Sequence, residues 1–321
     1  MSENQYISFL APHIEGYAKY LSTTNKWEPT IKKWLKNFDH YCDSFHDKTL
    51  RQEHIDSWSD KRTSETNASC GARVSKLNGF LRYLIDRNIY DISLAEVPKH
   101  EKHNNIPYFF SQEELIRFFR ECDSIEVLKS TREQKNRKMT TPVIFRLLYS
   151  TGMRPPEVRG LRCKDVDLTS GVISISETKG HIEHHIIMHE TMSEVMLLYD
   201  KHIRILYPER KYFFPGYHHE YLTVDWLSST FRNMWTKANG WSATHPVVYT
   251  FRHNYAIENI NSWTGNASDS FSKLVILSKS MGHTNLKSTM YYYSLCPKLS
   301  EIIEIQTGDK FNEIIPEVQH E

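Results

Sequence analysis

The chain has 321 residues, of which 39% are hydrophobic and 25% are charged, which is the composition of a globular protein of about two domains. This composition excludes a disordered or fibrous chain, and no apolar run approaches the ~20 residues that a membrane helix needs. The net charge is only +1, from 40 basic and 39 acidic residues, so total charge neither indicates nor excludes a nucleic-acid partner.

The first twenty residues mix polar and apolar side chains without the pattern of a signal peptide. The cysteines are odd in number and none belongs to a CxxC pair, which argues against a disulfide framework or a zinc site. They are Cys42, Cys70, Cys122, Cys163 and Cys296. We therefore expect a cytoplasmic protein with reduced thiols and no bound metal.

Residues 6–96 are expected to form helices, because apolar side chains such as Ile31, Leu35 and Phe38 recur at helical spacing. Basic residues lie between these apolar positions. Taken alone, such residues usually form a solvated helix face. The alternative is a helical module that grips the DNA backbone, and its contact residues would then be Lys32, Lys33, Lys36, Arg73 and Lys76.

Residues 99–107 are expected to link two domains, since the stretch 97–107 has two prolines and little apolar content. A new helix follows, which begins at a capping box formed by Ser111 and Glu114. We therefore expect a helical domain over residues 1–98, a second domain over 108–299 and an acidic tail over 300–321.

Within the second domain, residues 141–150 are expected to form a helix with Pro142 near its start and Gly152 just past its end. The apolar period then changes to that of strands. Residues 172–175 and 186–188 predict a hairpin with Lys179 at or near its turn. Helical segments resume after it, so the predicted fold class is mainly α with a small antiparallel β-sheet.

Three separated segments carry the residues that suggest chemistry. Arg154 directly follows an expected helix end, and Glu157 lies three residues later; alone, such a pair is commonly a surface ion pair. The second segment, residues 249–256, reads YTFRHNYA. The third, residues 281–293, contains a Gly-His pair and ends in three tyrosines.

Together these segments resemble the tyrosine recombinase, or phage integrase, family. The matching positions are Arg154 and Glu157 of a TG-x-R-x-x-E box, Arg252 and His253 of an RH box, Gly282 and His283 of a GH pair, Lys179 of a TKG stretch, and Tyr292. The resemblance covers residues 107–299, with a weaker match to the family's N-terminal core-binding helices. It implies an enzyme that cleaves and rejoins DNA through a 3′-phosphotyrosine bond, without metal, ATP or other cofactor.

The resemblance also implies a role for each residue. Arg154 and Arg252 would hold the non-bridging phosphate oxygens, because a planar guanidinium can bind them in a bidentate manner. Lys179 would protonate the leaving 5′-oxygen, and His283 would hydrogen-bond the phosphate. Tyr292 would be the nucleophile, and Glu157 would support the site without acting on substrate.

Tyr292 has two neighbouring tyrosines, Tyr291 and Tyr293, that compete for the same role. The family's nucleophile lies nine positions after the histidine of the GH pair, and His283 plus nine is Tyr292. The neighbours of Tyr292 would point to other faces of a helix.

Two departures from the family's pattern concern the second box. The family usually has a histidine three residues before its arginine, and here that residue is Tyr249. A phenol with a pKa near ~10 is a poor base at neutral pH, but it can still hydrogen-bond the phosphate or nucleophile. We therefore keep Tyr249 in the predicted site. The second departure is a long stretch between Arg252 and His283, where residues 262–267 are expected to form an enlarged surface loop.

The histidines near the hairpin invite a metal-site interpretation, which strand geometry argues against. His181, His185 and His189 would share one face but span too far for one ion, and His184 and His185 would face opposite ways. We expect contact with the DNA backbone or with solvent instead.

The expected partner is double-stranded DNA with a short inverted-repeat core site, held in a two-domain C-shaped clamp. Recombination needs four protomers, so we expect a homotetramer on DNA. Residues 300–321 are expected to dock onto a neighbour, and the alternative is that this tail packs on its own domain. Two alternatives stay open: a DNA-binding protein of this fold that has lost catalysis, and a DNA-relaxing enzyme similar to type IB topoisomerases.

Overall fold

The computed structural model describes residues 6–99, 107–176, 183–217, 220–242, 244–263 and 270–293. The chain divides into two compact units, Met1–Asn104 and Asn105–Glu321, and each is described by itself. Lys179, His181, most of the expected linker and loop, and the acidic tail lie outside the described residues.

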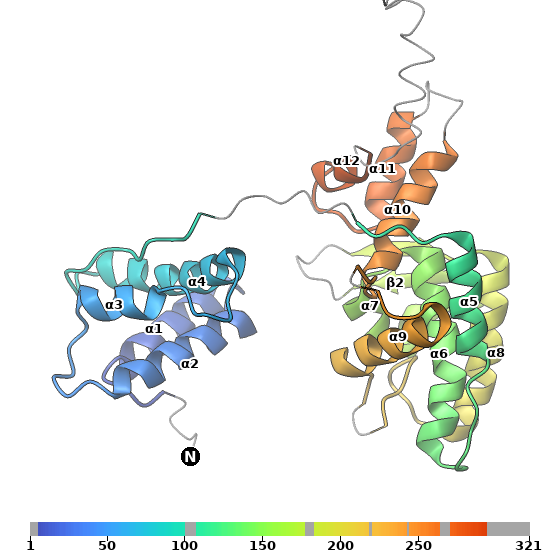
Figure 1. Cartoon of the computed structure of the whole chain (residues 1–321), viewed down its shortest axis with the longest axis horizontal. Helices are drawn as coiled ribbons and strands as arrows, with labels where there is room; N and C mark the ends of the chain where they lie inside the picture. The colour runs from blue at the N-terminus through green and yellow to red at the C-terminus, as the bar shows by residue number, and fades with distance from the viewer. Residues whose placement is uncertain are drawn as a thin grey trace, which may run out of the picture. The chain divides into compact units, whose positions relative to one another are not determined.

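The first unit contains four helices, α1 (Ala11–Ser22), α2 (Pro29–Asp43), α3 (Gln52–Ser59) and α4 (Asn67–Ile85) (Figure 1). Helix α4 contacts the other three and supplies the centre of the core. Its Val74, Leu77 and Phe80 are fully buried, as are Leu35 and Phe38 of α2. The helical periodicity predicted for this region is confirmed.

The described residues of the second unit are mainly helical and include a small three-stranded sheet (Figure 1). Its helices are α5 (Gln112–Asp123), α6 (Arg132–Thr151), α7 (Pro155–Arg159), α8 (Glu190–Leu206), α9 (Val224–Asn239), α10 (Thr250–Ser262), α11 (Ser270–Ser280) and α12 (Lys287–Tyr293), with a 3-10 turn η1 (Cys163–Asp165). The predicted fold class, mainly α with a small antiparallel sheet, is confirmed.

The sheet has the strand order β1 (Val166–Asp167), β2 (Val172–Ile175) and β3 (His184–Ile187), and both pairings are antiparallel. Its buried face holds Ile173, which pairs with Ile186. The predicted hairpin is therefore confirmed for its two strands, while its turn lies outside the described residues.

Two predicted helix ends have different outcomes. Ser111 and Glu114 form the expected capping box at the start of α5, with bonds of 3.2 and 2.8 Å to each other's backbone nitrogens. The predicted start of the next helix is wrong: α6 begins at Arg132, where Thr131 caps it, and Pro142 lies inside it. A proline in a helix removes one backbone donor, and the long buried face of α6 offsets that loss.

Among the described helices, none is both long enough and apolar enough to span a lipid bilayer.

Candidate active site

Arg154 is held at the start of the short helix α7 by Glu157. The Arg154 backbone N–H and its Nη1 donate to the two carboxylate oxygens of Glu157, at 2.8 and 2.7 Å. Glu157 is buried, whereas the Arg154 side chain stays 20% exposed. This pair is therefore not a screened surface ion pair, because its carboxylate fixes both the backbone and the guanidinium of Arg154.

Arg252 is carried into the interior by the helix that it belongs to. The preceding residue, Phe251, is fully buried against the rings of Phe118 and Phe231. Arg252 is itself only 1% exposed, and it donates from Nη1 to the Gly152 carbonyl at 2.7 Å and from Nη2 to the Met281 carbonyl at 2.6 Å. Its Nε is buried and has no partner among the described residues.

The three sequence boxes are thus joined by hydrogen bonds between their arginines and their backbones. The Arg252 guanidinium reaches the first box at Gly152 and the third at Met281. Arg154 Nη2 donates to the carbonyl of Gly282 at 2.7 Å. Because both arginines are tied to the same stretch before His283, the boxes form one site.

Two glycines whose carbonyls accept from the arginines are also closely packed against aromatic rings. Gly152 and Gly282 have φ of +63° and +60°, a left-handed conformation that residues with a Cβ adopt at a cost. A Cβ at Gly152 would lie 2.4 Å from the Tyr255 ring, and one at Gly282 would lie 2.6 Å from the His184 ring. Neither position has room for a side chain.

His283 lies beside the two arginines in a partly buried position. Its Nδ1 is 2.7 Å from the Thr289 hydroxyl, which orients the ring. Burial, followed by the charges of Arg252 and Arg154, lowers the pKa of His283 to about 4, so the imidazole is neutral at pH 7. A neutral imidazole can donate one hydrogen bond and accept another.

Tyr292 is buried, with 5% of its surface exposed, whereas its neighbour Tyr291 is 45% exposed. The Tyr292 ring stacks on His283 with centroids 6.2 Å apart and an interplanar angle of 13°. Burial raises the pKa of Tyr292 to about 12, although Arg252 and Arg154 lower it, so the resting phenol is protonated. Of these two tyrosines, Tyr292 is the one that faces the arginines.

Tyr249 and His253 complete the described part of the site. Tyr249 is 39% exposed and precedes α10, and His253 lies one helical turn later. The His253 ring is 5.2 Å from the Tyr249 ring and 5.5 Å from the Tyr292 ring, measured between centroids. Burial and the neighbouring Arg252 lower the pKa of His253.

The structure therefore brings six predicted residues together: Arg154, Glu157, Tyr249, Arg252, His283 and Tyr292. Lys179 lies outside the described residues. Sequence reasoning missed His184, which it assigned to DNA or solvent. His184 is buried beneath Gly282 and helps to lower the pKa of His283, while His185 faces solvent on the opposite side of β3.

The described residues include no group of histidine, cysteine or acidic side chains that could hold a metal ion.

The first unit presents the predicted basic residues in two different settings. Lys32, Lys33 and Lys36 are exposed on α2. Lys76 of α4 is half-buried, and its Nζ lies 3.6 Å from a carboxylate oxygen of Glu28. All four lysine side chains are accessible to solvent, so an anionic backbone could reach them.

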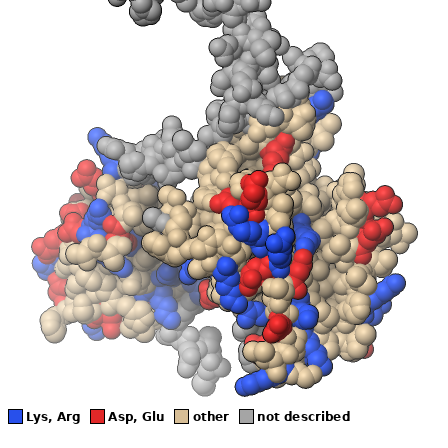
Figure 2. All heavy atoms as spheres, turned by 45° about the vertical axis from the view of Figure 1, so that its right-hand side comes forward, with Lys and Arg blue, Asp and Glu red and all other residues tan. Residues whose placement is uncertain are grey.

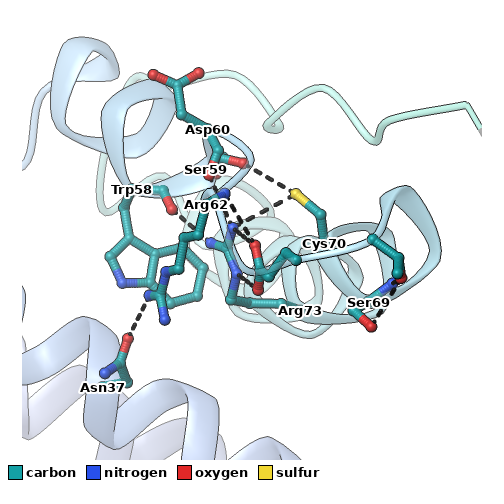
Figure 3. A network of polar contacts seen from close by, with 10 residues as sticks. Asn37, Trp58, Ser59, Asp60, Arg62, Ser69, Cys70 and Arg73 are labelled. Carbon is teal, nitrogen blue, oxygen red and sulfur yellow. Dashed lines mark hydrogen bonds and ion pairs between the residues drawn. The ribbon is translucent and has the colours of Figure 1, made fainter.

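Arg73 is an exception. The sequence predicted that it contacts DNA, and its complete burial contradicts that prediction. The side chain is fully buried and donates to the backbone carbonyls of Trp58 and Asp60 (Figure 3). Nε and Nη2 also donate to the two carboxylate oxygens of Glu65, each at 2.8 Å. This bidentate pair holds the pKa of Glu65 at about 2. Arg73 therefore fastens the segment between α3 and α4 and is not available to a phosphate.

Arg62 lies on the segment that Arg73 fastens, and sequence reasoning passed over it. It is exposed, donates from Nη2 to Asn37 of α2 at 2.9 Å, and its guanidinium carbon is 5.8 Å from the ring centroids of both Trp34 and Trp58 (Figure 3). No helical periodicity marks this position, because it belongs to a turn. It adds a positive charge beside the lysines of α2.

Charge on the face shown in Figure 2 is mixed, since Lys and Arg are interspersed there with Asp and Glu. The second unit contains such pairs, including Arg146 with Asp123 at 2.7 Å and Lys237 with Glu121 at 3.6 Å. This face therefore offers no uniform basic surface.

The two arginines join the three sequence boxes into one site, and comparison with known proteins shows the family. Residues 110–298 match the model of the phage integrase family. The chain belongs to this family, so the resemblance to tyrosine recombinases is confirmed.

Its relatives include a probable integrase/recombinase protein of Methanocaldococcus jannaschii, 26% identical over 171 residues, which are 52% of this chain and 49% of that protein. The chain thus spans about half the length of this relative. The tyrosine recombinase XerC of Bacillus pumilus is 25% identical over 236 residues, covering 71% of this chain and 70% of XerC.

Two solved structures show the same fold. One is the XerH site-specific recombinase bound to a palindromic difH substrate, with a TM-score of 0.61, 19% identity, and coverage of 88% of this chain and 79% of XerH. The other is a lambda integrase tetramer bound to a Holliday junction, with a TM-score of 0.60, 15% identity, and coverage of 88% and 76%.

Proposed function

We propose that this chain is a site-specific DNA recombinase that cleaves and rejoins strands through a 3′-phosphotyrosine bond. The observation that carries the proposal is the gathering of three groups around Tyr292: His283 stacks on its ring, and Arg252 and Arg154 interact with it electrostatically. Arg252 is a buried cation whose hydrogen bonds go to neutral carbonyls. The carboxylate that interacts electrostatically with Arg252 is that of Glu157, which is already bonded to Arg154. A buried charge is costly, and a bound phosphate would supply the negative charge for two arginines.

Each of the described site residues has its own proposed role in transesterification. Arg154 and Arg252 would stabilise the charge that develops on the non-bridging oxygens, and neutral His283 would hydrogen-bond one of them. The Tyr292 oxygen would attack phosphorus and displace the 5′-oxygen. The proton for that leaving group is assigned to Lys179 by the family resemblance. Because the ester is conserved in the phosphotyrosine, rejoining needs no external energy source.

For the DNA partner, we propose a short inverted-repeat site. The first unit would serve as the core-binding domain, with Lys32, Lys33 and Lys36 on the backbone and Arg62 beside them. Lys76 would add a further contact. Such phosphate contacts give affinity that falls as salt rises and carry no sequence information themselves.

We also propose assembly into a tetramer on DNA. Support comes from an apolar surface beside the site, where Ile187, Phe271 and Ile276 are 80%, 69% and 66% exposed. Ile187 and Ile276 line a hollow of about 830 Å³ formed by β3, α10 and α11. A second copy would cover this surface, and residues 300–321, outside the described part, are the proposed docking segment. A cytoplasmic location fits this function and is proposed with it.

A nicked suicide duplex in EDTA tests the proposal against its alternatives. Loss of the short fragment past the nick traps a covalent adduct, which a protein without catalysis would not form. A topoisomerase-like enzyme would form adducts on DNA of many sequences and would not exchange strands between two sites. Adduct at one mapped site, with recombinant product from two such sites, is the expected result. An absolute need for Mg²⁺ would contradict the assignment.

A further inference from the structure

Tyr249 occupies the place of a histidine in the family's second box, which leaves open what takes the proton of the nucleophile. A phenol is protonated at neutral pH and cannot accept that proton well. The attack of Tyr292 on phosphorus nevertheless releases a proton, and burial has raised the pKa of Tyr292 to about 12. A neutral base next to the Tyr292 ring is therefore needed.

We propose that His253, one turn after Tyr249 on α10, accepts the proton of Tyr292 during strand cleavage and returns it during rejoining. This inference rests on the proposed recombinase function and adds to it the identity of the base. Residues four apart lie on the same helix face, so His253 presents an imidazole to the same side as Tyr249. Its ring is 5.5 Å from that of Tyr292, between centroids.

The nitrogen chemistry of His253 fits an acceptor. Its Nδ1 is buried and has no hydrogen-bond partner among the described residues. Buried polar atoms are usually paired, so an unpaired nitrogen on a ring whose centroid is 5.5 Å from that of Tyr292 calls for a function. Burial, followed by the neighbouring Arg252 charge, lowers the pKa of His253, so the ring is neutral at physiological pH and its unprotonated nitrogen is available as an acceptor.

The charged and titratable groups around His253 belong to the site itself. Tyr249 and Arg252 adjoin it on α10, and Tyr292 of α12 lies against it. Arg154 interacts electrostatically with Arg252, and the His283 ring stacks on Tyr292. His283 is the other imidazole near the phenol, but its Nδ1 already lies 2.7 Å from the Thr289 hydroxyl.

The proposed step is balanced without another reactant. The phenolic O–H bond breaks and its proton goes to the His253 imidazole, while the phenolic oxygen forms a bond to phosphorus. The bond from phosphorus to the 5′-oxygen breaks, and that oxygen takes a proton from the general acid. In rejoining, the imidazolium returns its proton to the departing phenolate.

The test isolates deprotonation of the nucleophile by removing the need for a general acid. A suicide duplex with a sulfur in place of the bridging 5′-oxygen has a leaving thiolate that needs no proton. Single-turnover cleavage is measured against pH for the full-length wild type, His253→Gln and Tyr249→Phe. His202→Gln, at an exposed histidine of α8, is the matched control.

We expect His253→Gln to lose at least ~100-fold in rate at neutral pH, as removal of a general base does. Its rate should rise with hydroxide across the range in which the wild-type rate is flat. Added imidazole should restore cleavage to His253→Ala, which also answers the objection that the variants are merely unstable. DNA affinity and melting temperature serve as the measures of folding.

A near-wild-type rate and pH profile for His253→Gln would overturn the proposal. So would a profile that changes in Tyr249→Phe and stays unchanged in both His253 variants, or a folded His253→Ala that imidazole does not rescue. In each of these cases the wild type still forms adduct, and the recombinase assignment stands. If the wild type forms no adduct at all, it is the proposed function that fails.

Discussion

Arg252 donates a hydrogen bond of 2.7 Å from Nη1 to the carbonyl oxygen of Gly152, one hundred residues earlier and two residues before Arg154. Through this bond Arg252 fixes the turn that leads to Arg154, and these two arginines are the ones proposed to bind phosphate. Arg154 in turn donates to Gly282, next to His283. The relative positions of the three groups therefore depend on backbone carbonyls, and not on side-chain packing alone.

Replacing either arginine with lysine should abolish most cleavage. A lysine in Arg154→Lys or Arg252→Lys keeps the charge but cannot bind a carbonyl and a phosphate oxygen at once in a planar fork. We expect the single-turnover rate to fall at least ~100-fold in each variant. Arg252→Lys also loses buried hydrogen bonds, so its melting temperature is measured alongside. A folded variant with a near-normal rate would remove that arginine from the site.

Gly282→Ala should damage both stability and cleavage. The left-handed backbone costs a residue with a Cβ about 1–2 kcal/mol, and here the new methyl would also meet the His184 ring. The carbonyl that holds Arg154 would then shift. Gly240→Ala is the control for a positive φ without a clash, because Gly240 has φ +79° and ψ 178° and no atom lies within 4 Å of the new Cβ.

Urea denaturation and adduct formation are measured for both glycine variants. Gly240→Ala should show only the backbone cost and cleave normally. Equal cleavage by the two variants would mean that the Gly282 carbonyl does not position Arg154.

Arg73 and Lys33 should separate stability from DNA affinity. Arg73→Met leaves the Glu65 carboxylate without its buried partner, and breaking such a pair costs about 3–5 kcal/mol. Lys33→Met should leave stability unchanged, weaken DNA binding and reduce the salt dependence of log Kd by about one unit. Denaturation and binding at several salt concentrations test this. A stable Arg73→Met protein with lower DNA affinity would reverse our assignment.

The low pKa of His283 predicts that stability falls in acid. Its pKa is about 4 in the folded chain, against an ordinary value near ~6.5, so between these values the unfolded chain binds more protons. Above pH ~6.5, His283 is neutral in both states and does not reduce the free energy of unfolding. As pH falls from there toward about 4, the unfolded chain takes up the proton first and the free energy of unfolding decreases. His253 acts in the same direction. In urea denaturation over this range, His283→Gln should depend less steeply on pH than the wild type. An identical dependence would contradict the lowered pKa.

The sequence predicted the members of the site better than their environment. Arg154, Arg252, His283 and Tyr292 stand at motif spacings, and those spacings are visible without coordinates. That Glu157 grips Arg154 from the interior is a matter of burial, which a three-residue spacing does not reveal. The contact of His184 with Gly282 joins a strand to a distant turn, and no local pattern encodes it.

Arg73 and Pro142 are positions where a local sequence pattern is present but the structure departs from it. Arg73 lies on the same helix as Lys76 and Arg82, but which face of α4 is buried depends on its contact with α3, and the carboxylate of Glu65 made burial of the Arg73 charge possible. Pro142 normally marks a helix start, yet α6 begins at Arg132 and continues through the proline, because its long buried face packs on α8 and α10. In both cases tertiary contacts outweighed a correct local tendency.

The most direct test of the account is to identify the residue that becomes joined to DNA. Full-length protein is incubated with the suicide duplex in EDTA, the adduct is digested, and the peptide that carries the nucleotide is sequenced by mass spectrometry. The account predicts a 3′-phosphate on Tyr292, no adduct from Tyr292→Phe despite normal DNA binding, and adduct from Tyr291→Phe. A nucleotide on Tyr291, on Tyr293 or on any other residue, or cleavage by Tyr292→Phe, would contradict it.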